Sequence, residues 1–379
     1  MLDNEIIQKN DENRFSKLTK QHSSSSLKNV GSLKKIILKK NFNEKINEAN
    51  FLNLDAIAPD NTDSDENAGI YQLSAYVSDI YRYLRWKETQ MCLAPDYLSG
   101  KKVTSSNRAK LLDWLIIVHQ KFELLPETLH LSVRLLDQYL NNTDTSNRVL
   151  QLVGITCLWI ASKFEEIYTP SVSDFVFVTA DSFDKNEINE CEKSIVSTLE
   201  FDLNPPTCLA FLKRAAKISK IGLTEYCLAK FAIEIVNISY DLLHYLPSHI
   251  GCASLYLARI LKAYSDGQDV AKSSSNGEDF SDNIWNISVS FHTAYSEYDL
   301  FDLMLRISSE IETHCTKQPR SSVYNKYKRE KVCSVSRMPV CTLARKIAEN
   351  YVEYRREKLS CKPGKKVLGL IENLSLNPN

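Results

Sequence analysis

The stretch that most constrains the fold of this chain is RVLQLVGITCLWIASKFEEIYTP, residues 148–170. Between Val149 and Ala161, only Gln151 and Thr156 carry polar side chains. A helix with this pattern is apolar on every face, which is typical of a helix buried on all sides. The stretch is shorter than the roughly 20 residues that cross a membrane, and Pro170 prevents the helix from continuing. It therefore predicts the central helix of a soluble all-α core.

The apolar stretch occurs twice in the chain. Residues 154–161, GITCLWIA, match residues 251–258, GCASLYLA, in pattern and side-chain size, which indicates an internal duplication. We expect each copy to bury one apolar helix inside a ring of four others. The first copy has Asn147 as its expected N-cap and charged residues from Lys163 onward, whereas the second copy has Ile260 in place of that lysine. The second copy lacks a lysine at the corresponding position, so we expect the charged helix end of the first copy to face a partner.

Composition narrows the class of protein. A chain of 379 residues suits two domains, and its ten Gly and eleven Pro are few, which favours long helices. Lys plus Arg and Asp plus Glu both number 47, so net charge gives no attraction to nucleic acid. Ten cysteines without a CxxC pair indicate free thiols in a reducing compartment. With no apolar segment at the start, no secretory signal is expected, and we expect a protein of the nucleus and cytoplasm.

The remaining chain divides into a polar tail and a series of helices. Residues 1–70 show no lasting apolar periodicity, so we expect a disordered tail. Asp184 with Glu187 three residues on has the pattern of a capping box. Residues 264–283 are polar with Gly and Ser and predict a flexible loop. Apolar spacing and breakers predict helices over residues 76–85, 107–122, 127–140, 148–163, 185–199 and 342–360.

The sequence shows no catalytic, metal-binding or cofactor-binding pattern. The GxGxxG and GxxxxGK[ST] phosphate-binding motifs are absent, as is HExxH. His119 and His130 fall in predicted helices and are expected to be core or boundary residues. From the residues alone, Lys163 is a cation that stabilises its helix end, and Glu192 is a surface acid. We therefore expect no catalytic residue, no cofactor and no metal.

Several motifs together resemble one family. ASKFEEIYTP, residues 161–170, resembles the cyclin-box signature in the form typical of A- and B-type mitotic cyclins. Between about residues 74 and 330 the chain also resembles B-type cyclins, in order and spacing, at residues 76–85, 97–115, 127–140, 173–183 and 211–223. The resemblance implies an all-α fold of two tandem five-helix cyclin boxes, preceded by an N-terminal helix and the disordered tail. The implied parts are residues 71–204, the first box with its leading helix; 205–318, the second box; and 319–379, a C-terminal extension.

The resemblance also implies a function. B-type cyclins are regulatory subunits that bind and activate a cyclin-dependent protein kinase at the G2/M transition, and they catalyse no reaction themselves. Kinase substrates and inhibitors are further partners, whereas nucleic acid and membranes are not. In cyclins, the residues that match Lys163 and Glu192 pair with each other and bond backbone groups of the kinase. The apolar positions that surround this pair correspond to Phe164, Tyr76, Ile80, Tyr83, Val196 and Leu203.

The chain departs from its family at a substrate-docking patch. Cyclins often read Met-Arg-Ala-Ile-Leu where this chain has Asn107 in place of the Met and Lys110 in place of the Ile. Ile117 stands where a Glu often recruits a basic peptide residue. We therefore expect weak docking of Arg-x-Leu peptides. The patch positions are Asn107, Lys110, Leu111, Trp114 and Gln151.

Two other functions are compatible with a cyclin-like fold. One is a transcription-factor-like module that binds duplex DNA, which the balanced charge disfavours. The other is a helical scaffold that activates no kinase.

Overall fold

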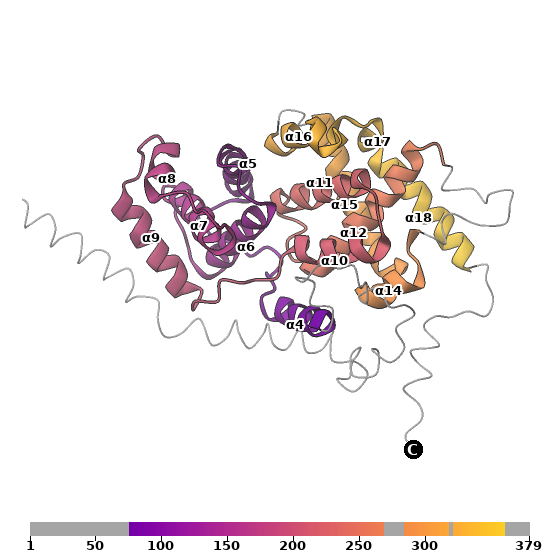
Figure 1. Ribbon diagram of the computed structural model, residues 1–379, viewed down its shortest axis with the longest axis horizontal. Helices are drawn as coiled ribbons and strands as arrows, with labels where there is room; N and C mark the ends of the chain where they lie inside the picture. The colour runs from indigo at the N-terminus through magenta and orange to yellow at the C-terminus, as the bar shows by residue number, and fades with distance from the viewer. Residues whose placement is uncertain (1–75, 269–283, 318–320, 361–379) are drawn as a thin grey trace, which may run out of the picture. The chain divides into compact units, whose positions relative to one another are not determined.

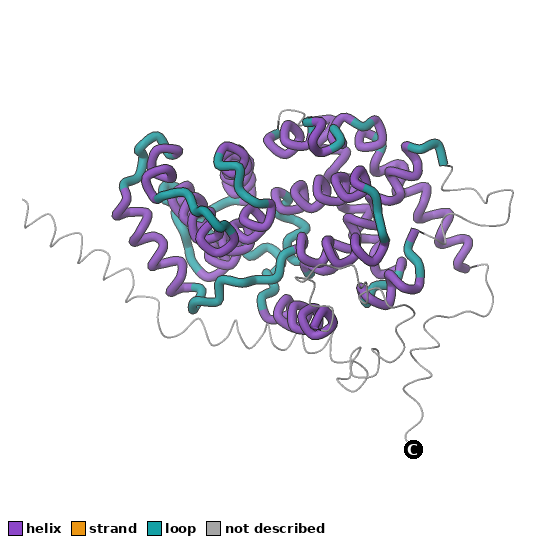
Figure 2. The backbone as a smooth tube through the Cα atoms, in the orientation of Figure 1, coloured by secondary structure: helices purple, strands orange, loops and turns teal. Residues whose placement is uncertain are grey.

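The computed structural model describes residues 76–268, 284–317 and 321–360. These residues belong to one compact unit of the chain. Within them every regular element is helical (Figure 2), as the sequence predicts. The expected disordered tail, most of the expected loop at 264–283 and the last residues of the C-terminal extension lie outside the described residues.

A leading helix and five further helices form the first repeat. The central helix of this repeat is α7, which is contacted by α5, α6, α8 and α9 (Figure 1). The side chains of Ile155, Cys157 and Leu158 on α7 have no exposed area. The prediction of one apolar helix inside a ring of four is therefore confirmed for this copy. The bounds are α4 (Val77–Gln90), α5 (Ser105–Lys121), α6 (Pro126–Asn142), α7 (Leu150–Glu165), α8 (Val172–Val178) and α9 (Lys185–Thr198).

The second repeat surrounds its central helix, α12, with a different set of neighbours. Helices α10, α11 and α15 contact α12, but α14 packs chiefly on α10. The side of α12 left open is covered by α18 of the C-terminal extension, where the Tyr256 hydroxyl donates to the Tyr351 hydroxyl at 3.1 Å. The expected ring of four helices from the repeat itself is thus wrong for this copy. The bounds are α10 (Cys208–Ser219), α11 (Leu223–Ile238), α12 (Pro247–Ser265), α14 (Ile287–Thr293), α15 (Glu297–Lys317) and α18 (Ala344–Ser360).

The C-terminal extension packs back on both repeats. The backbone N–H of Ser322 donates to Asp113 on α5 at 2.7 Å. Lys326 and Tyr327 both donate to the buried carboxylate of Glu234 on α11, each at 2.7 Å to Oε1. Burial alone raises the pKa of Glu234, but the nearby Lys326 ammonium and these hydrogen bonds bring it below its usual value. The short elements of the extension are α16 (Ser322–Tyr327), η3 (Glu330–Val332), η4 (Val335–Arg337) and α17 (Pro339–Thr342).

A buried ion pair fixes the first repeat against the second. Arg108 on α5 donates to both carboxylate oxygens of Asp137 on α6, at 2.6 and 2.7 Å. It also donates to the backbone carbonyl of Ile238 on α11 at 3.2 Å. The Tyr97 hydroxyl donates to the same carboxylate at 2.8 Å. A buried carboxylate with this many donors is fully satisfied, so the pair can hold α5, α6 and α11 in one arrangement.

Helix ends show where local sequence signals succeed and fail. The Asp184–Glu187 capping box is present, with both hydrogen bonds at 2.8 Å. The predicted N-cap at Asn147 is wrong, because α7 begins at Leu150 and Asn147 instead accepts from the Asn107 amide at 2.8 Å. The start of the predicted loop at residue 264 is also wrong, since α12 continues to Ser265.

Candidate partner-binding surface

The charged end of α7 meets α9 at an ion pair. Lys163 lies in the last turn of α7, where a cation interacts favourably with the helix dipole. Its ammonium is paired with the carboxylate of Glu192 on α9 and lies 3.7 Å from the centroid of the Trp159 ring. The two charged side chains are 39% and 24% exposed. The Trp159 ring therefore helps to hold the Lys163 ammonium in place, while both charged side chains remain partly accessible to a partner.

Packing beneath this pair explains its position. Ile188 and Ile195 of α9 have no exposed area and lie in the same core as α7. Val196 and Leu203 are partly buried against that core. Phe164, directly after Lys163, is half exposed. The buried side of α9 thus sets the distance to α7, and its other side presents Glu192.

Large exposed apolar side chains follow the ends of α7 and α9 in the sequence. Ile167 and Tyr168, which follow the end of α7, are 90% and 91% exposed. Phe201, just after α9, is 76% exposed and has a left-handed backbone with φ 61°. Exposed large apolar residues of this kind are candidates for contact with a partner. The sequence interpretation missed these three residues, although apolar residues placed directly after a helix end and before a turn are a usable signal.

Helix α4 adds a second set of exposed apolar residues. Tyr76, Ile80 and Tyr83 are 59%, 44% and 49% exposed. Trp86, which was not among the residues predicted from the sequence to bind a partner, is 59% exposed. Its ring centroid lies 5.8 Å from that of Tyr83. They recur at helical spacing, so the apolar stripe predicted for residues 76–85 faces away from the core.

The buried contacts of α4 are polar and hold it in place. Glu88 accepts from the backbone N–H and hydroxyl of Ser248, at 2.9 and 2.6 Å. Lys87 pairs with Asp202 at 2.7 Å. Because Asp202 directly follows Phe201, this bond joins α4 to the exposed segment after α9. We call Lys163, Glu192 and the apolar positions Phe164, Tyr76, Ile80, Tyr83, Val196 and Leu203 the partner surface.

The expected docking patch is only partly on the surface. Leu111 is 7% exposed and packs under α7, where a Cβ atom on Gly154 would lie 2.7 Å from it. Asn107 is half-buried and bonded to Asn147, and Trp114 is also half-buried. Lys110 and Gln151 are exposed. Leu111 therefore supports the patch from below.

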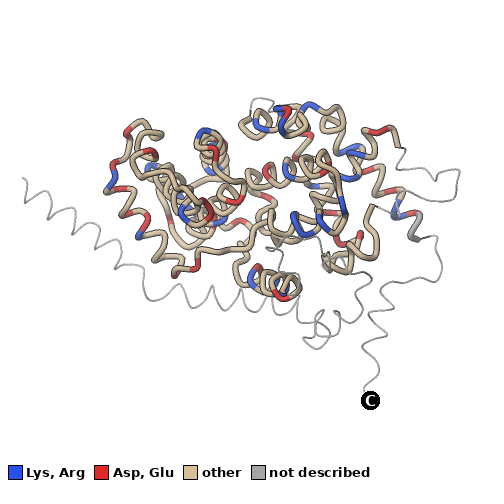
Figure 3. The backbone as a smooth tube through the Cα atoms, in the orientation of Figure 1, with Lys and Arg blue, Asp and Glu red and all other residues tan. Residues whose placement is uncertain are grey.

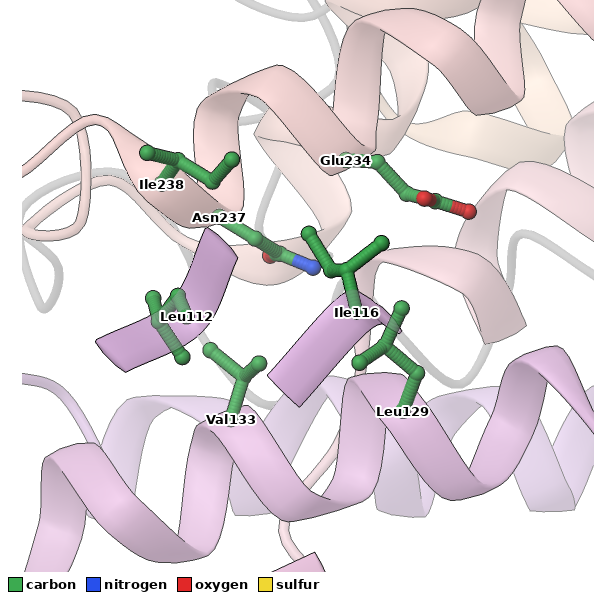
Figure 4. Close-up of a pocket in the computed structure, with 7 residues that line it drawn as sticks. All are labelled: Leu112, Ile116, Leu129, Val133, Glu234, Asn237 and Ile238. Atoms are coloured by element: carbon green, nitrogen blue, oxygen red, sulfur yellow. The ribbon is translucent and has the colours of Figure 1, made fainter. Parts of the chain in front are cut away.

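A small cavity lies between the repeats. It has a volume of about 10 Å³, room for no more than one water molecule. One polar wall is Glu234, whose carboxylate is already bonded to Lys326. The cavity is thus a packing feature of the repeat interface. Figure 4 shows the residues that line it, which are Leu112, Ile116, Leu129, Val133, Glu234, Asn237 and Ile238.

The two histidines predicted for the core are buried there. His119 has a ring nitrogen 2.9 Å from the Leu125 carbonyl, and His130 has one 2.9 Å from the Asn237 amide. Burial lowers the pKa of both to about 4, so both are neutral at pH 7. Across the described ranges, His, Cys, Asp and Glu nowhere gather in a group of three that could hold a metal. Among the described helices, none combines the length and apolar character needed to cross a membrane.

The architecture and the accessible ion pair together define a class of protein. The first of two tandem helical repeats carries an accessible ion pair together with exposed apolar residues, which is typical of a helical protein-binding module. Residues 79–204 match the family model of the cyclin N-terminal domain, and residues 206–340 match that of the cyclin C-terminal domain. The chain belongs to the cyclin family.

Relatives in the family are mitotic cyclins. The chain is 35% identical over 269 residues to the G2/mitotic-specific cyclin-B2 of Bos taurus, and 38% identical over 273 residues to that of Anguilla japonica. Each match covers 70% of this chain and 63% of the relative. The G2/mitotic-specific cyclin-B of Patella vulgata is 34% identical over 267 residues, 70% of this chain and 61% of the relative. The chain thus covers less than two thirds of the length of these relatives.

Proposed function

We propose that this chain is a B-type cyclin, a regulatory subunit that binds and activates a cyclin-dependent protein kinase at the G2/M transition. The carrying observation is the Lys163–Glu192 pair, which is accessible and is followed closely in the sequence by the exposed apolar residues Phe164, Ile167 and Tyr168. An ammonium group has three donors and a carboxylate has several acceptor sites, so both can bond each other and a partner at once. The similarity to proteins described as G2/mitotic-specific supports the mitotic assignment.

The mechanism is binding without chemistry. Apolar side chains of the partner surface pack on the helix of the kinase whose Glu must pair with the ATP-orienting Lys. The Lys163–Glu192 pair bonds backbone groups beside that helix. A partner that binds the active arrangement better shifts the population of kinase molecules toward it. We expect the complex to bury more than about 2,000 Å² in total, as signalling assemblies do.

The rigidity of the cyclin supports this role. The Arg108–Asp137 pair holds α5 and α6 against α11, and the contacts of Lys87 and Glu88 hold α4 beside both repeats. A preformed surface loses little entropy on binding, so more of the contact energy remains for selecting the active kinase arrangement.

Further partners and the cellular location belong to the same proposal. We propose that kinase substrates and inhibitors also bind the complex, that nucleic acid and membranes do not, and that the protein acts in the nucleus and cytoplasm. Basic and acidic residues are interspersed along the described helices (Figure 3), which disfavours a DNA-binding stripe.

One experiment separates the proposed function from its alternatives. The full chain is used to capture partners from a cell extract, and the captured material is assayed for histone phosphorylation and analysed by mass spectrometry. We expect a cyclin-dependent kinase with histone kinase activity. Capture of partners without kinase activity would instead indicate a scaffold, and a salt-dependent shift of duplex DNA would indicate a nucleic-acid-binding module.

A further inference from the structure

One proline of this chain directly follows a residue with a side-chain hydroxyl. Of the eleven prolines in the sequence, Pro170 alone follows a Ser or Thr residue, namely Thr169. The dipeptide lies in the irregular segment between α7 and α8, and Thr169 is exposed. Proline-directed protein kinases accept a hydroxyl residue only where proline follows it. An exposed threonine in non-helical backbone before proline is therefore a suitable substrate for such an enzyme.

Thr169 is bonded to a backbone carbonyl near the negative end of helix α7, where added negative charge is unfavourable. Its hydroxyl donates to the carbonyl of Ser162, near the negative end of α7, at 3.3 Å. Glu165 and Glu166 lie between the two residues in sequence. Burial first, and then the charge of Glu166, raise the pKa of Glu165, so negative charge is already crowded at this helix end.

Thr169 also lies next to the exposed apolar residues described above. Tyr168 directly precedes it and Ile167 comes before that, at 91% and 90% exposure. Lys163 and Phe164 of the partner surface lie just upstream in the same stretch. Any change in charge or backbone at Thr169 therefore acts on the surface that the proposed kinase partner covers.

We propose that Thr169 is a phosphorylation site for a proline-directed Ser/Thr protein kinase, and that the phosphate prevents the partner kinase from binding. The inference rests on the proposed function of the partner surface. In the reaction the Thr169 oxygen attacks the γ-phosphorus of Mg²⁺-bound ATP. A new O–P bond forms, the bond between the γ-phosphorus and the bridging oxygen breaks, ADP leaves, and the hydroxyl proton passes to the base of the modifying kinase.

Three physical effects oppose binding once the phosphate is present. It adds about −1.5 to −2 charges near the negative end of α7, in the segment that directly follows Glu165 and Glu166 in the sequence. The esterified oxygen can no longer donate to Ser162, which frees the segment that carries Ile167 and Tyr168. A charged phosphate would also have to be desolvated within the interface. Because the partner kinase covers this region, the modification acts on the free cyclin.

The first test asks whether the site is used. The full chain is incubated with an active, purified proline-directed kinase and Mg²⁺-ATP, and phosphorylated residues are mapped by mass spectrometry. We expect modification of Thr169, and its loss in Pro170→Ala. We further expect at least tenfold slower modification when the chain is first assembled with its partner kinase. Equal rates for the free and assembled chain, or no modification of Thr169, would overturn the inference.

The second test asks what the phosphate does. Affinity for the partner kinase is measured by titration calorimetry before treatment, after phosphorylation, and after removal of the phosphate by a phosphatase. We expect at least a tenfold loss of affinity that the phosphatase reverses. Thr169→Glu is compared with Thr342→Glu, because Thr342 is an exposed threonine that also donates to a backbone carbonyl, that of Pro339 at 2.8 Å. We expect weakened binding only for Thr169→Glu.

The results of these tests distinguish a failure of the proposed function from a failure of the phosphorylation proposal alone. If the untreated chain does not bind the kinase at all, the proposed function is wrong and the inference falls with it. If the untreated chain binds and the phosphorylated chain binds equally well, the proposed function stands and only the inference is overturned.

Discussion

Arg108 and Asp137 form a two-bond ion pair in which neither side chain has any exposed area. Truncating one member of such a pair leaves an unpaired buried charge, so we predict that Arg108→Ala lowers the free energy of unfolding by roughly 3–5 kcal/mol. Replacing both residues by apolar ones, Arg108→Met with Asp137→Leu, should cost less, because no charge is stranded. Urea unfolding followed by circular dichroism measures both.

An exposed pair gives the control for this prediction. Lys102 and Asp144 are paired at 3.0 Å, but their side chains are 64% and 53% exposed. Lys102→Ala should change stability by no more than about 1 kcal/mol. Similar losses for Lys102→Ala and Arg108→Ala would show that burial does not determine the value of the Arg108 pair.

The buried His130 predicts a dependence of stability on pH. Its pKa is lowered from 6.5 to about 4, chiefly by burial. Between these values the unfolded chain binds more protons than the folded chain, so stability rises with pH. The contribution of His130 is complete above about pH 6.5 and is lost as pH falls toward 4. We predict that the wild type loses roughly 2–3 kcal/mol more stability than His130→Gln between pH 7 and 4.5.

Measuring unfolding of both proteins across that range checks this prediction. The comparison isolates His130 because His119, whose pKa is also lowered to about 4, is present in both proteins. Parallel stability curves for the wild type and His130→Gln would contradict it.

The docking patch predicts altered substrate recruitment. Asn107 is bonded to Asn147, Lys110 is exposed, and Leu111 is buried beneath α7. The patch therefore presents little apolar surface and carries a positive charge. We predict weak binding of Arg-x-Leu peptides to the wild type, and at least tenfold tighter binding to Asn107→Met with Lys110→Ile. An apolar side chain that becomes buried contributes roughly 1.5–3 kcal/mol.

Fluorescence anisotropy with a labelled peptide measures this affinity. Lys346→Ile, at an exposed position of α18, adds the same apolar group elsewhere and should leave the affinity unchanged. Tight binding by the wild type that the double substitution does not alter would show that positions 107 and 110 do not line the docking site.

The sequence predicts what short-range patterns encode. The all-round apolar stretch of α7 and the Asp184–Glu187 capping box depend on neighbouring residues, and both are present in the structure. Asn147 failed as an N-cap because a side-chain partner distant in the sequence, Asn107, takes its hydrogen bond. Likewise, the contact of α18 with Tyr256 joins segments 95 residues apart, which no local pattern specifies.

The candidate site likewise combines features that neighbouring residues determine with contacts between residues distant in the sequence. The position of Lys163 at a charged helix end follows from the sequence, but its pairing with Glu192 depends on how α9 packs on α7. Family resemblance supplied that pair, and residue patterns alone did not. The exposure of Ile167 and Phe201 was missed, because apolar character in the sequence usually predicts burial.

The affinity of substituted chains for the kinase shows whether the Lys163–Glu192 pair binds it. Desolvated charge pairs cost roughly 2–5 kcal/mol when one member is truncated. Lys163→Ala and Glu192→Ala should thus each weaken kinase binding by about 30- to 4,000-fold and abolish activation, with unchanged helical circular dichroism. Lys193→Ala, which removes a 70% exposed cation from the same helix α9, is the control and should bind normally. Wild-type affinity for the kinase in both Lys163→Ala and Glu192→Ala would contradict the account.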